Sequence, residues 1–246
     1  MELIKTGTEG LDQILKGGLR KNSSVLITGA PGTGKTIMAL QFIYYGAKDS
    51  NENGIFISTE EDLNDLRDYA KNFGMDFKEM EKKGKIFLYE KPVAMLRGGL
   101  VSLSGLLNLI KKKKIQRIAF DSIIFFEYLY PKLSNNTMEF RRQVLLFMQK
   151  MKRANVTLLT VSERKITDLD RLEYDMMDFV FEGFIMLSRI RKGSYFERVL
   201  TVEKMRGQEH NLDIYPIAID KKGVRILHDQ VPFSLVERQE EKIDFK

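Results

Sequence analysis

The chain has no cysteine, no tryptophan and only two histidines among its 246 residues. Without cysteine it can form neither disulfides nor thiolate metal sites. With only His210 and His228 available, a histidine-rich zinc site is also excluded. A chain without cysteine is typical of a reducing compartment, so we expect a cytoplasmic protein.

Long hydrophobic runs are also missing. The apolar stretch 118–130 is interrupted by Asp121 and Glu127, and no run approaches the length that spans a bilayer. The first six residues lack the cationic and then apolar pattern of a signal peptide. We therefore expect a soluble protein with no membrane partner.

Charge of one sign is only slightly in excess. The 40 Lys and Arg against 34 Asp and Glu leave a net charge of +6, which permits contact with nucleic acid without arguing for it. The densest basic run, 111–114, ends an apolar helical pattern, where cations complement the helix dipole. We interpret this run as a solvated helix end, with a phosphate-binding patch as the alternative.

Hydrophobic residues make up 43% of the chain, enough for the core of one α/β domain over 1–246, with two small domains as the less favoured alternative. Apolar runs alternate with helical patterns through about residue 160, which predicts a mostly parallel twisted sheet flanked by helices. We expect strands at 25–28, 55–58, 86–89, 118–121 and 157–160, and helices near 35–48, 60–73, 102–114 and 137–154.

The pattern changes after about residue 180, where short strands joined by turns predict a C-terminal antiparallel extension at one edge of the sheet. The segments concerned are 184–188, 196–204, 215–219 and 224–227. Polar or charged stretches predict mobile loops at 129–136 and 163–178 and a flexible charged tail at 237–246.

The most specific motif is Gly29–Thr36, whose sequence Gly-Ala-Pro-Gly-Thr-Gly-Lys-Thr fits the phosphate-binding loop of P-loop proteins. An apolar run suited to a buried strand precedes it, and a helical pattern follows. A strand, a glycine turn and a helix N-terminus together direct several backbone N–H groups at one point, which favours an anion. We expect a nucleoside triphosphate to lie against Gly29, Ala30, Pro31, Gly32, Thr33, Gly34, Lys35, Thr36 and Ile37.

Two further side chains fit the same chemistry. Lys35 would reach the β- and γ-phosphates, and the hydroxyl of Thr36 would coordinate Mg²⁺. Asp121 ends the apolar run 118–121, where a strand emerges beside the expected phosphate site, so we expect it to orient the metal. The alternative is that Asp121 only caps a helix.

Hydrolysis also needs a carboxylate that orients or deprotonates water. Glu60 and Glu61 directly follow the expected strand 55–58 and are well placed for this role. The alternative is equally strong: Thr59 would cap the next helix, and both glutamates would lie in its first turn, near the positive end of the dipole.

The order and spacing of these and other motifs resemble the KaiC-like branch of the RecA superfamily ATPases, and the likeness covers most of the chain. The N-terminal segment 1–20 contributes Thr6–Asp12 and Gly17–Leu19. The stretch from Ser162-Glu163-Arg164 to Val180 also resembles the family. The most specific match is 204–210, with the sequence Lys-Met-Arg-Gly-Gln-Glu-His.

This resemblance implies a RecA-like P-loop NTPase core that binds ATP and ADP. In that family the nucleotide lies between neighbouring subunits of a ring, commonly a hexamer, which implies a homo-oligomer. The resemblance assigns Lys204 and Arg206 to the γ-phosphate of the adjacent subunit, as cations supplied in trans. It also assigns Asn72, Met205 and His210 to nucleotide binding. Without the family, 204–206 is an ordinary strand end with solvated charges.

Some positions depart from the family pattern. KaiC carries two such domains, whereas this chain resembles one. A family lysine just beyond His210 is Leu212 here, and a family acid near the ribose falls on Lys221, with Asp220 one place earlier. No convincing Ser-Thr autophosphorylation pair occurs in 163–170. The contacts to base and ribose therefore stay open.

The favoured hypothesis is a ring-forming, Mg²⁺-dependent ATPase that switches conformation or partner on hydrolysis. Lys35, Glu60 or Glu61, Lys204 and Arg206 would be its catalytic residues. One alternative is a RadA-like or RecA-like ATPase that binds DNA through the loops 129–136 and 164–178, but these carry few uncompensated cations. Another is a kinase that transfers phosphate to itself or to a partner. The sequence identifies no protein partner.

Overall fold

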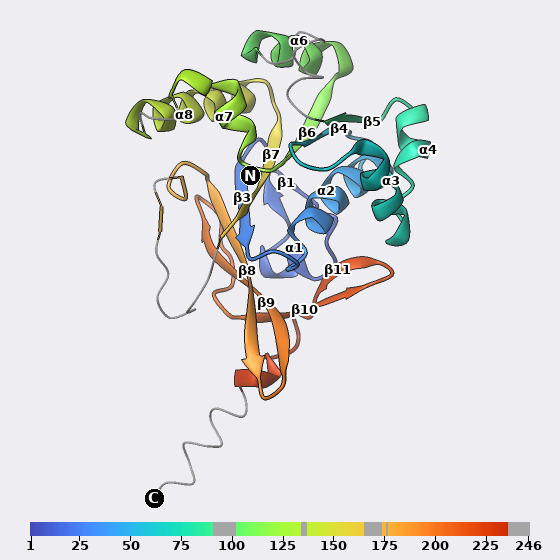
Figure 1. Ribbon diagram of the computed structural model, residues 1–246, viewed down its shortest axis with the longest axis vertical. Coiled ribbons are helices and arrows are strands. Elements are labelled where there is room, and N and C mark those ends of the chain that lie inside the picture. Colours follow the sequence, from blue (N-terminus) through green and yellow to red (C-terminus); the bar gives the residue numbers. More distant parts are fainter. Residues whose placement is uncertain (91–101, 134–136, 165–173, 176, 236–246) are drawn as a thin grey trace, which may run out of the picture.

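The computed structural model describes residues 1–90, 102–133, 137–164, 174–175 and 177–235. In this part of the chain, nine strands form one sheet in the order β11-β10-β9-β8-β3-β7-β6-β4-β5 (Figure 1). The strands are β3 (Ser24–Gly29), β4 (Asn53–Ser58), β5 (Ile86–Glu90), β6 (Ile115–Asp121), β7 (Thr157–Glu163), β8 (Gly183–Lys192), β9 (Tyr195–Met205), β10 (Tyr215–Asp220) and β11 (Gly223–Ile226).

The sheet is parallel from β5 to β8 and antiparallel from β8 to β11. This confirms the predicted α/β fold with a C-terminal antiparallel extension. The extension starts from a strand with two kinds of neighbour, because β8 runs parallel to β3 and antiparallel to β9. A small separate pairing, β1 (Leu3–Ile4) with β2 (Leu19–Arg20), organises the N-terminal segment together with α1 (Leu11–Ile14).

Helices cover both faces of the sheet (Figure 1). One face packs against α2 (Lys35–Asp49), α3 (Leu63–Asn72) and α4 (Phe77–Lys82). The other packs against α6 (Leu103–Lys113), α7 (Phe125–Leu129) and α8 (Thr137–Arg153). Among the described residues, no helix combines the length and apolar character that crossing a membrane requires.

Several details differ from the prediction. The helix expected from residue 60 begins at Leu63, because the side chain of Asp62 accepts a hydrogen bond from the backbone N–H of Asn64 at 2.7 Å and caps it. The short helices α4 and α7 were not predicted. The expected loop at 129–136 contains a 3₁₀ turn, Pro131–Leu133. The expected mobile segments 134–136, 165–173 and 176, and the tail 237–246, lie outside the described residues.

The basic run at 111–114 is the solvated end of a helix, as predicted. Lys111, Lys112 and Lys113 form the last turn of α6, and Lys114 ends it in the left-handed conformation, with φ of 52°. All four side chains are exposed. Their charges therefore lie at the negative end of the helix dipole.

A buried arginine ties the N-terminal segment to the centre of the sheet. Arg117 of β6 is 1% exposed and forms an ion pair with Glu52. Its guanidinium donates hydrogen bonds to the backbone carbonyls of Lys5 and Phe42, at 2.8 and 3.0 Å. Position 46 must be glycine here, since a Cβ would collide with the Arg117 side chain. Groups from several distant segments thus pair this charge, although its Nη2 is buried without a hydrogen-bond partner among the described residues.

Removing Glu52 should therefore destabilise the protein strongly. Glu52→Ala leaves the buried guanidinium without its carboxylate, and we expect the free energy of unfolding to fall by about 3–5 kcal/mol in urea denaturation. Lys83→Ala, which breaks an exposed ion pair with Glu79, is the control and should change it little. Equal effects of the two substitutions would contradict this role for the buried pair.

Candidate nucleotide-binding site

The phosphate-loop motif joins the end of β3 to the start of α2. Gly34 precedes the first helical residue with φ of 108°, a conformation that side chains rarely adopt. It also lies against the β10–β11 hairpin, where a Cβ at this position would approach Val224 to 2.9 Å and Ile219 to 3.1 Å. Glycine at this position thus allows both the turn and the close approach of the hairpin.

A cavity of about 260 Å³ opens beside this loop, at the carboxyl ends of the central parallel strands. The phosphate loop and the start of α2 line it with Pro31, Gly32, Gly34, Lys35, Thr36 and Ile37. The ends of β4, β6 and β7, with the segment after β4, add Ser58, Glu60, Glu61, Asp121 and Glu163. Ligands of open α/β sheets bind in this position, outside the carboxyl ends of the strands.

Lys35 lies inside the loop with little contact to solvent. Its side chain is 7% exposed, and its ammonium group donates a hydrogen bond to the backbone carbonyl of Ala30 at 3.0 Å. The carboxylate of Glu163 lies 4.0 Å from it. Burial lowers the pKa of Lys35, while Glu163, Asp121 and Glu60 act in the opposite direction. The ammonium group therefore has a backbone carbonyl and a distant carboxylate as partners, and an anion in direct contact would bind it more strongly.

Thr36, in the first turn of α2, and Asp121, at the end of β6, both line the cavity. Burial raises the pKa of Asp121 to about 6, the nearby Thr36 hydroxyl counteracts this, and the carboxylates of Glu61 and Glu60 reinforce it. Within the described residues no cluster of three or more acidic or histidine side chains could hold a metal by itself. One hydroxyl and one carboxylate suit Mg²⁺, which commonly completes its shell with phosphate oxygens and water.

The segment that follows β4 is held by hydroxyl groups. The Thr59 hydroxyl donates to the backbone carbonyl of Asp121 at 3.1 Å and accepts from the N–H of Ser122 at 2.9 Å. The Ser58 hydroxyl accepts from the N–H of Glu61 at 2.9 Å. Thr59 therefore fastens β4 to β6, and the suggestion that it caps a helix is wrong.

Glu60 and Glu61 lie in the turn ahead of α3, and both line the cavity. The alternative that placed them in the first turn of this helix is wrong, because Asp62 is the cap and the helix begins after it. Burial raises the pKa of Glu61, with further contributions from Glu60 and Asp65. The structure thus brings both glutamates together with Lys35, Thr36 and Asp121.

Other predicted residues do not line the cavity of this chain. Gly29 and Ala30 are not among its lining residues, and Thr33 is buried with its hydroxyl donating to the Ala30 carbonyl at 2.8 Å. Asn72 is exposed at the end of α3. The remaining set belongs to the end of β9 and the segment after it, namely Lys204, Met205, Arg206 and His210.

This second group is tied to the turn that precedes β8. The ammonium group of Lys204 donates to the carbonyl of Asp178 at 2.7 Å, and the guanidinium of Arg206 donates to the carbonyl of Phe179 at 3.0 Å. Met205 is buried, and a His210 ring nitrogen lies 3.1 Å from the carbonyl of Asn211. Burial lowers the pKa of Lys204, and the neighbouring Arg206 lowers it further. Neither Lys204 nor Arg206 lines the cavity of its own chain.

Sequence reasoning missed Tyr69, Glu163 and Ser58 as lining residues. Tyr69 projects from α3, and burial raises the pKa of its hydroxyl. The sequence offers one signal for this residue: it follows Glu61 at a spacing of about two helical turns, although Glu61 itself precedes α3. Glu163 belongs to a segment whose resemblance to the family was noted, but its 4.0 Å approach to Lys35 depends on the pairing of β3 with β7.

Known proteins with similar sequences point to one family. The family model described as "ATPase: KaiC" matches residues 4–231. The chain belongs to this family. It is 30% identical to the circadian clock oscillator protein KaiC of Parasynechococcus marenigrum over 92% of its own length and 45% of the relative's. For the KaiC of Parathermosynechococcus lividus the identity is 31%, over 90% of this chain and 42% of the relative.

The chain thus spans somewhat less than half the length of these curated relatives. A solved structure has a comparable length: the KaiC-like protein PH0186 from Pyrococcus horikoshii OT3 is 30% identical, with a TM-score of 0.76, over 92% of this chain and 98% of that one. The similarity confirms a KaiC-like fold of the RecA type.

The raised pKa of Asp121 predicts a pH-dependent effect of Asp121→Asn. The folded pKa is about 6 and the ordinary value 3.8, so the unsubstituted protein loses stability as this carboxyl ionises between these pH values. Asn does not ionise and avoids this loss. The stability of the nucleotide-free Asn variant relative to the unsubstituted protein should therefore be greater at pH 7.5 than at pH 4 by on the order of 1–2 kcal/mol, measured by urea denaturation. A stability difference that is the same at both pH values would contradict the assignment.

Proposed function

We propose that this member of the KaiC family is a Mg²⁺-dependent ATPase that works as a ring-forming switch. The observation that carries the proposal is the single cavity at which the phosphate loop, Lys35, the Thr36–Asp121 pair and two glutamates converge. Backbone N–H groups at the start of α2 would hold the phosphates, and Lys35 would leave the Ala30 carbonyl for them.

Thr36 and Asp121 would hold the metal ion. Bound there, Mg²⁺ would neutralise charge on the phosphate oxygens and lower the cost of charge development during transfer. Both side chains line the same cavity, where their oxygens would face one ion. The desolvated carboxyl of Asp121 would be returned to its ionised form by the cation beside it.

One of the two glutamates would orient and deprotonate water. Glu61 fits this role better than Glu60, because Ser58 holds its backbone on both sides, accepting from its N–H and donating to its carbonyl at 3.0 Å. Its side chain is exposed, but partial desolvation still raises its pKa. Glu60 would then contribute its negative charge to the electrostatic potential of the site.

Glu61→Gln and Glu60→Gln form a matched pair of tests. Since Gln keeps the size but loses the basic carboxylate, Glu61→Gln should lower kcat for phosphate release by about 10²–10⁴-fold while Mg-ATP still binds. Glu60→Gln should reduce turnover much less. Phosphate release and nucleotide binding are measured on both variants; a larger loss for Glu60→Gln would reverse the assignment.

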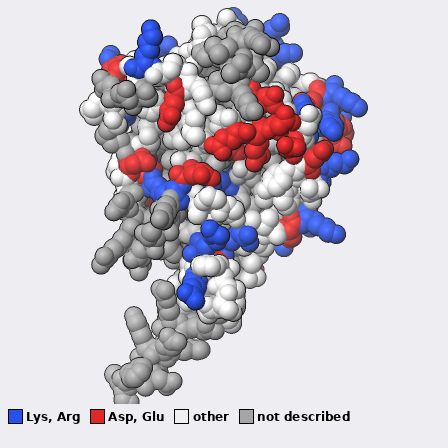
Figure 2. All heavy atoms as spheres, in the orientation of Figure 1, with Lys and Arg blue, Asp and Glu red and all other residues white. Residues whose placement is uncertain are grey.

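We further propose that the site is completed by a neighbouring copy of the chain. Figure 2 shows acidic side chains gathered beside α3, where Glu60, Glu61, Asp62, Asp65 and Asp68 are exposed. Such a rim suits a partner that brings cations. Lys204 and Arg206, which do not line the cavity of their own chain, are the residues that a head-to-tail ring would deliver there.

Lys204→Ala tests this assembly. We expect it to lower kcat by about 10²–10³-fold, since a preorganised cation at the developing charge is lost, without preventing the oligomer that forms with Mg-ATP. Light scattering gives the oligomer size, and phosphate release gives the turnover. Lys112→Ala, at the exposed end of α6, is the control. Normal turnover by an intact Lys204→Ala oligomer would remove the trans role.

The DNA-binding and kinase alternatives are supported by no specific observation in the described residues. Both loops that would contact DNA fall partly outside them. Arg164, at the start of the second loop, already forms ion pairs with Asp175 and Asp178. We therefore keep ATP hydrolysis as the single proposed activity.

A further inference from the structure

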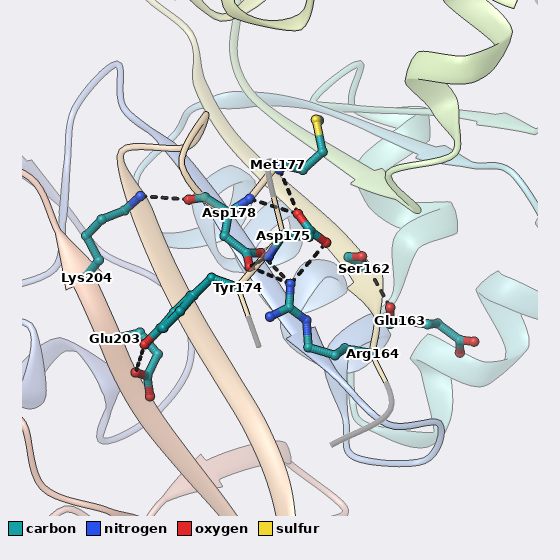
Figure 3. A network of polar contacts seen from close by, with 9 residues as sticks. All are labelled: Ser162, Glu163, Arg164, Tyr174, Asp175, Met177, Asp178, Glu203 and Lys204. Carbon is teal, nitrogen blue, oxygen red and sulfur yellow. Dashed lines mark hydrogen bonds and ion pairs between the residues drawn. The ribbon is translucent and has the colours of Figure 1, made fainter. Parts of the chain in front are cut away.

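An ion pair at the end of β7 lies between the two groups of site residues. Arg164 directly follows this strand, and one guanidinium nitrogen lies 2.6 Å from each carboxylate oxygen of Asp178 (Figure 3). The same nitrogen lies 3.2 Å from a carboxylate oxygen of Asp175. The Asp178 side chain is 2% exposed, so this charge pair is shielded from solvent.

The turn that Arg164 holds also accepts hydrogen bonds from Lys204 and Arg206. These two cations donate to the carbonyls of the successive residues Asp178 and Phe179. The Asp178 carboxylate also accepts from the N–H of Asp175 at 2.8 Å, which closes the turn on itself (Figure 3). One series of contacts therefore runs from Arg164 through Asp178 and its turn to the two cations.

Arg164 is fastened in turn to the phosphate loop of its own chain. Its backbone N–H donates to the carbonyl of Gly29 at 3.1 Å. The preceding residue, Glu163, lies 4.0 Å from the ammonium group of Lys35. Glu163 and Arg164 therefore contact the candidate nucleotide site of their own chain. Arg164 also contacts Asp178, whose backbone carbonyl accepts from Lys204.

We infer that Arg164 and Asp178 are positioning residues that hold Lys204 and Arg206 for the nucleotide site of the neighbouring subunit. This inference rests on the proposed function, in which those two cations act in trans. The alternative is that the pair only stabilises the fold. The two interpretations predict different results: loss of a positioning pair lowers turnover at the neighbouring subunit's site, whereas loss of a stabilising pair affects the folding of its own chain.

The first measurement separates turnover from folding. Arg164→Ala should lower kcat for phosphate release by about 10–100-fold, because a displacement of about 1 Å at a catalytic group costs this much, while KM for Mg-ATP and the oligomer size change little. Asp178→Asn should have the same effect, and Arg164→Lys should restore part of the turnover. Arg67→Ala, which breaks a two-contact ion pair with Glu81 at 2.8 and 2.9 Å, is the matched control.

The second measurement mixes subunits. A hydrolysis-deficient glutamate variant, Glu61→Gln or Glu60→Gln, keeps its own Lys204 intact, so in a mixed ring it should rescue a partner whose only defect lies in its trans cations. We therefore mix it with Lys204→Ala and, separately, with Arg164→Ala, and compare phosphate release with that of each variant alone. Rescue of both supports the inference.

The two failures are distinguishable. If Lys204→Ala is rescued and Arg164→Ala is not, Arg164 acts within its own chain and the positioning role is overturned, while the trans assignment stands. If Lys204→Ala is not rescued, the trans assignment of the proposed function is itself wrong, and the inference that rests on it is lost with it.

Discussion

The desolvated carboxyl of Asp121 is the group on which the candidate site depends. It ends β6 in the cavity that Thr36 also lines, and burial raises its pKa to about 6. A carboxyl in that state opposes folding at neutral pH and favours a cation. The protein thus retains a locally unfavourable group where a metal-bound phosphate would compensate for it.

The parallel sheet explains why these residues meet at all. The strands β3, β7, β6 and β4 are hydrogen-bonded neighbours and run in one direction, so the segments that follow them emerge along the same edge. Lys35, Asp121, Glu163 and the paired glutamates come from four such segments. Lys204 and Arg206 come from the end of β9 and the residue after it, in the antiparallel part of the sheet, and do not line this cavity; under the proposed trans role, hydrolysis depends on assembly.

Much of this arrangement follows from the sequence, because its signals are local. The phosphate loop has a fixed spacing, and Asp121 ends an apolar run that is typical of a buried strand. The start of α3 was misplaced since Ser58, Thr59 and Asp62 all carry side chains that can cap a helix, and only tertiary contacts show that Thr59 bonds to β6 instead. The short helices α4 and α7 carry too few residues for a periodic pattern.

Contacts between distant segments could not be predicted in this way. Tyr69 reaches the cavity only because α3 lies across it, and Arg164 meets Asp178 only because the chain returns to the sheet beside β3. The same holds for Gln208, whose amide donates to the carbonyls of Leu15 and Gly18 at 2.7 and 2.6 Å and fastens the segment after Lys204 to the N-terminal segment. Such contacts depend on the fold, and no regular spacing of residues in the sequence reveals them.

The central claim is tested most directly by a crystal structure with Mg²⁺ and a non-hydrolysable ATP analogue. The account predicts the triphosphate against the backbone N–H groups of residues 32–36, the ion at the Thr36 hydroxyl on the side of Asp121, and a neighbouring subunit's Lys204 at the terminal phosphate. A triphosphate bound away from this loop, or an ion that ignores both Thr36 and Asp121, would contradict it.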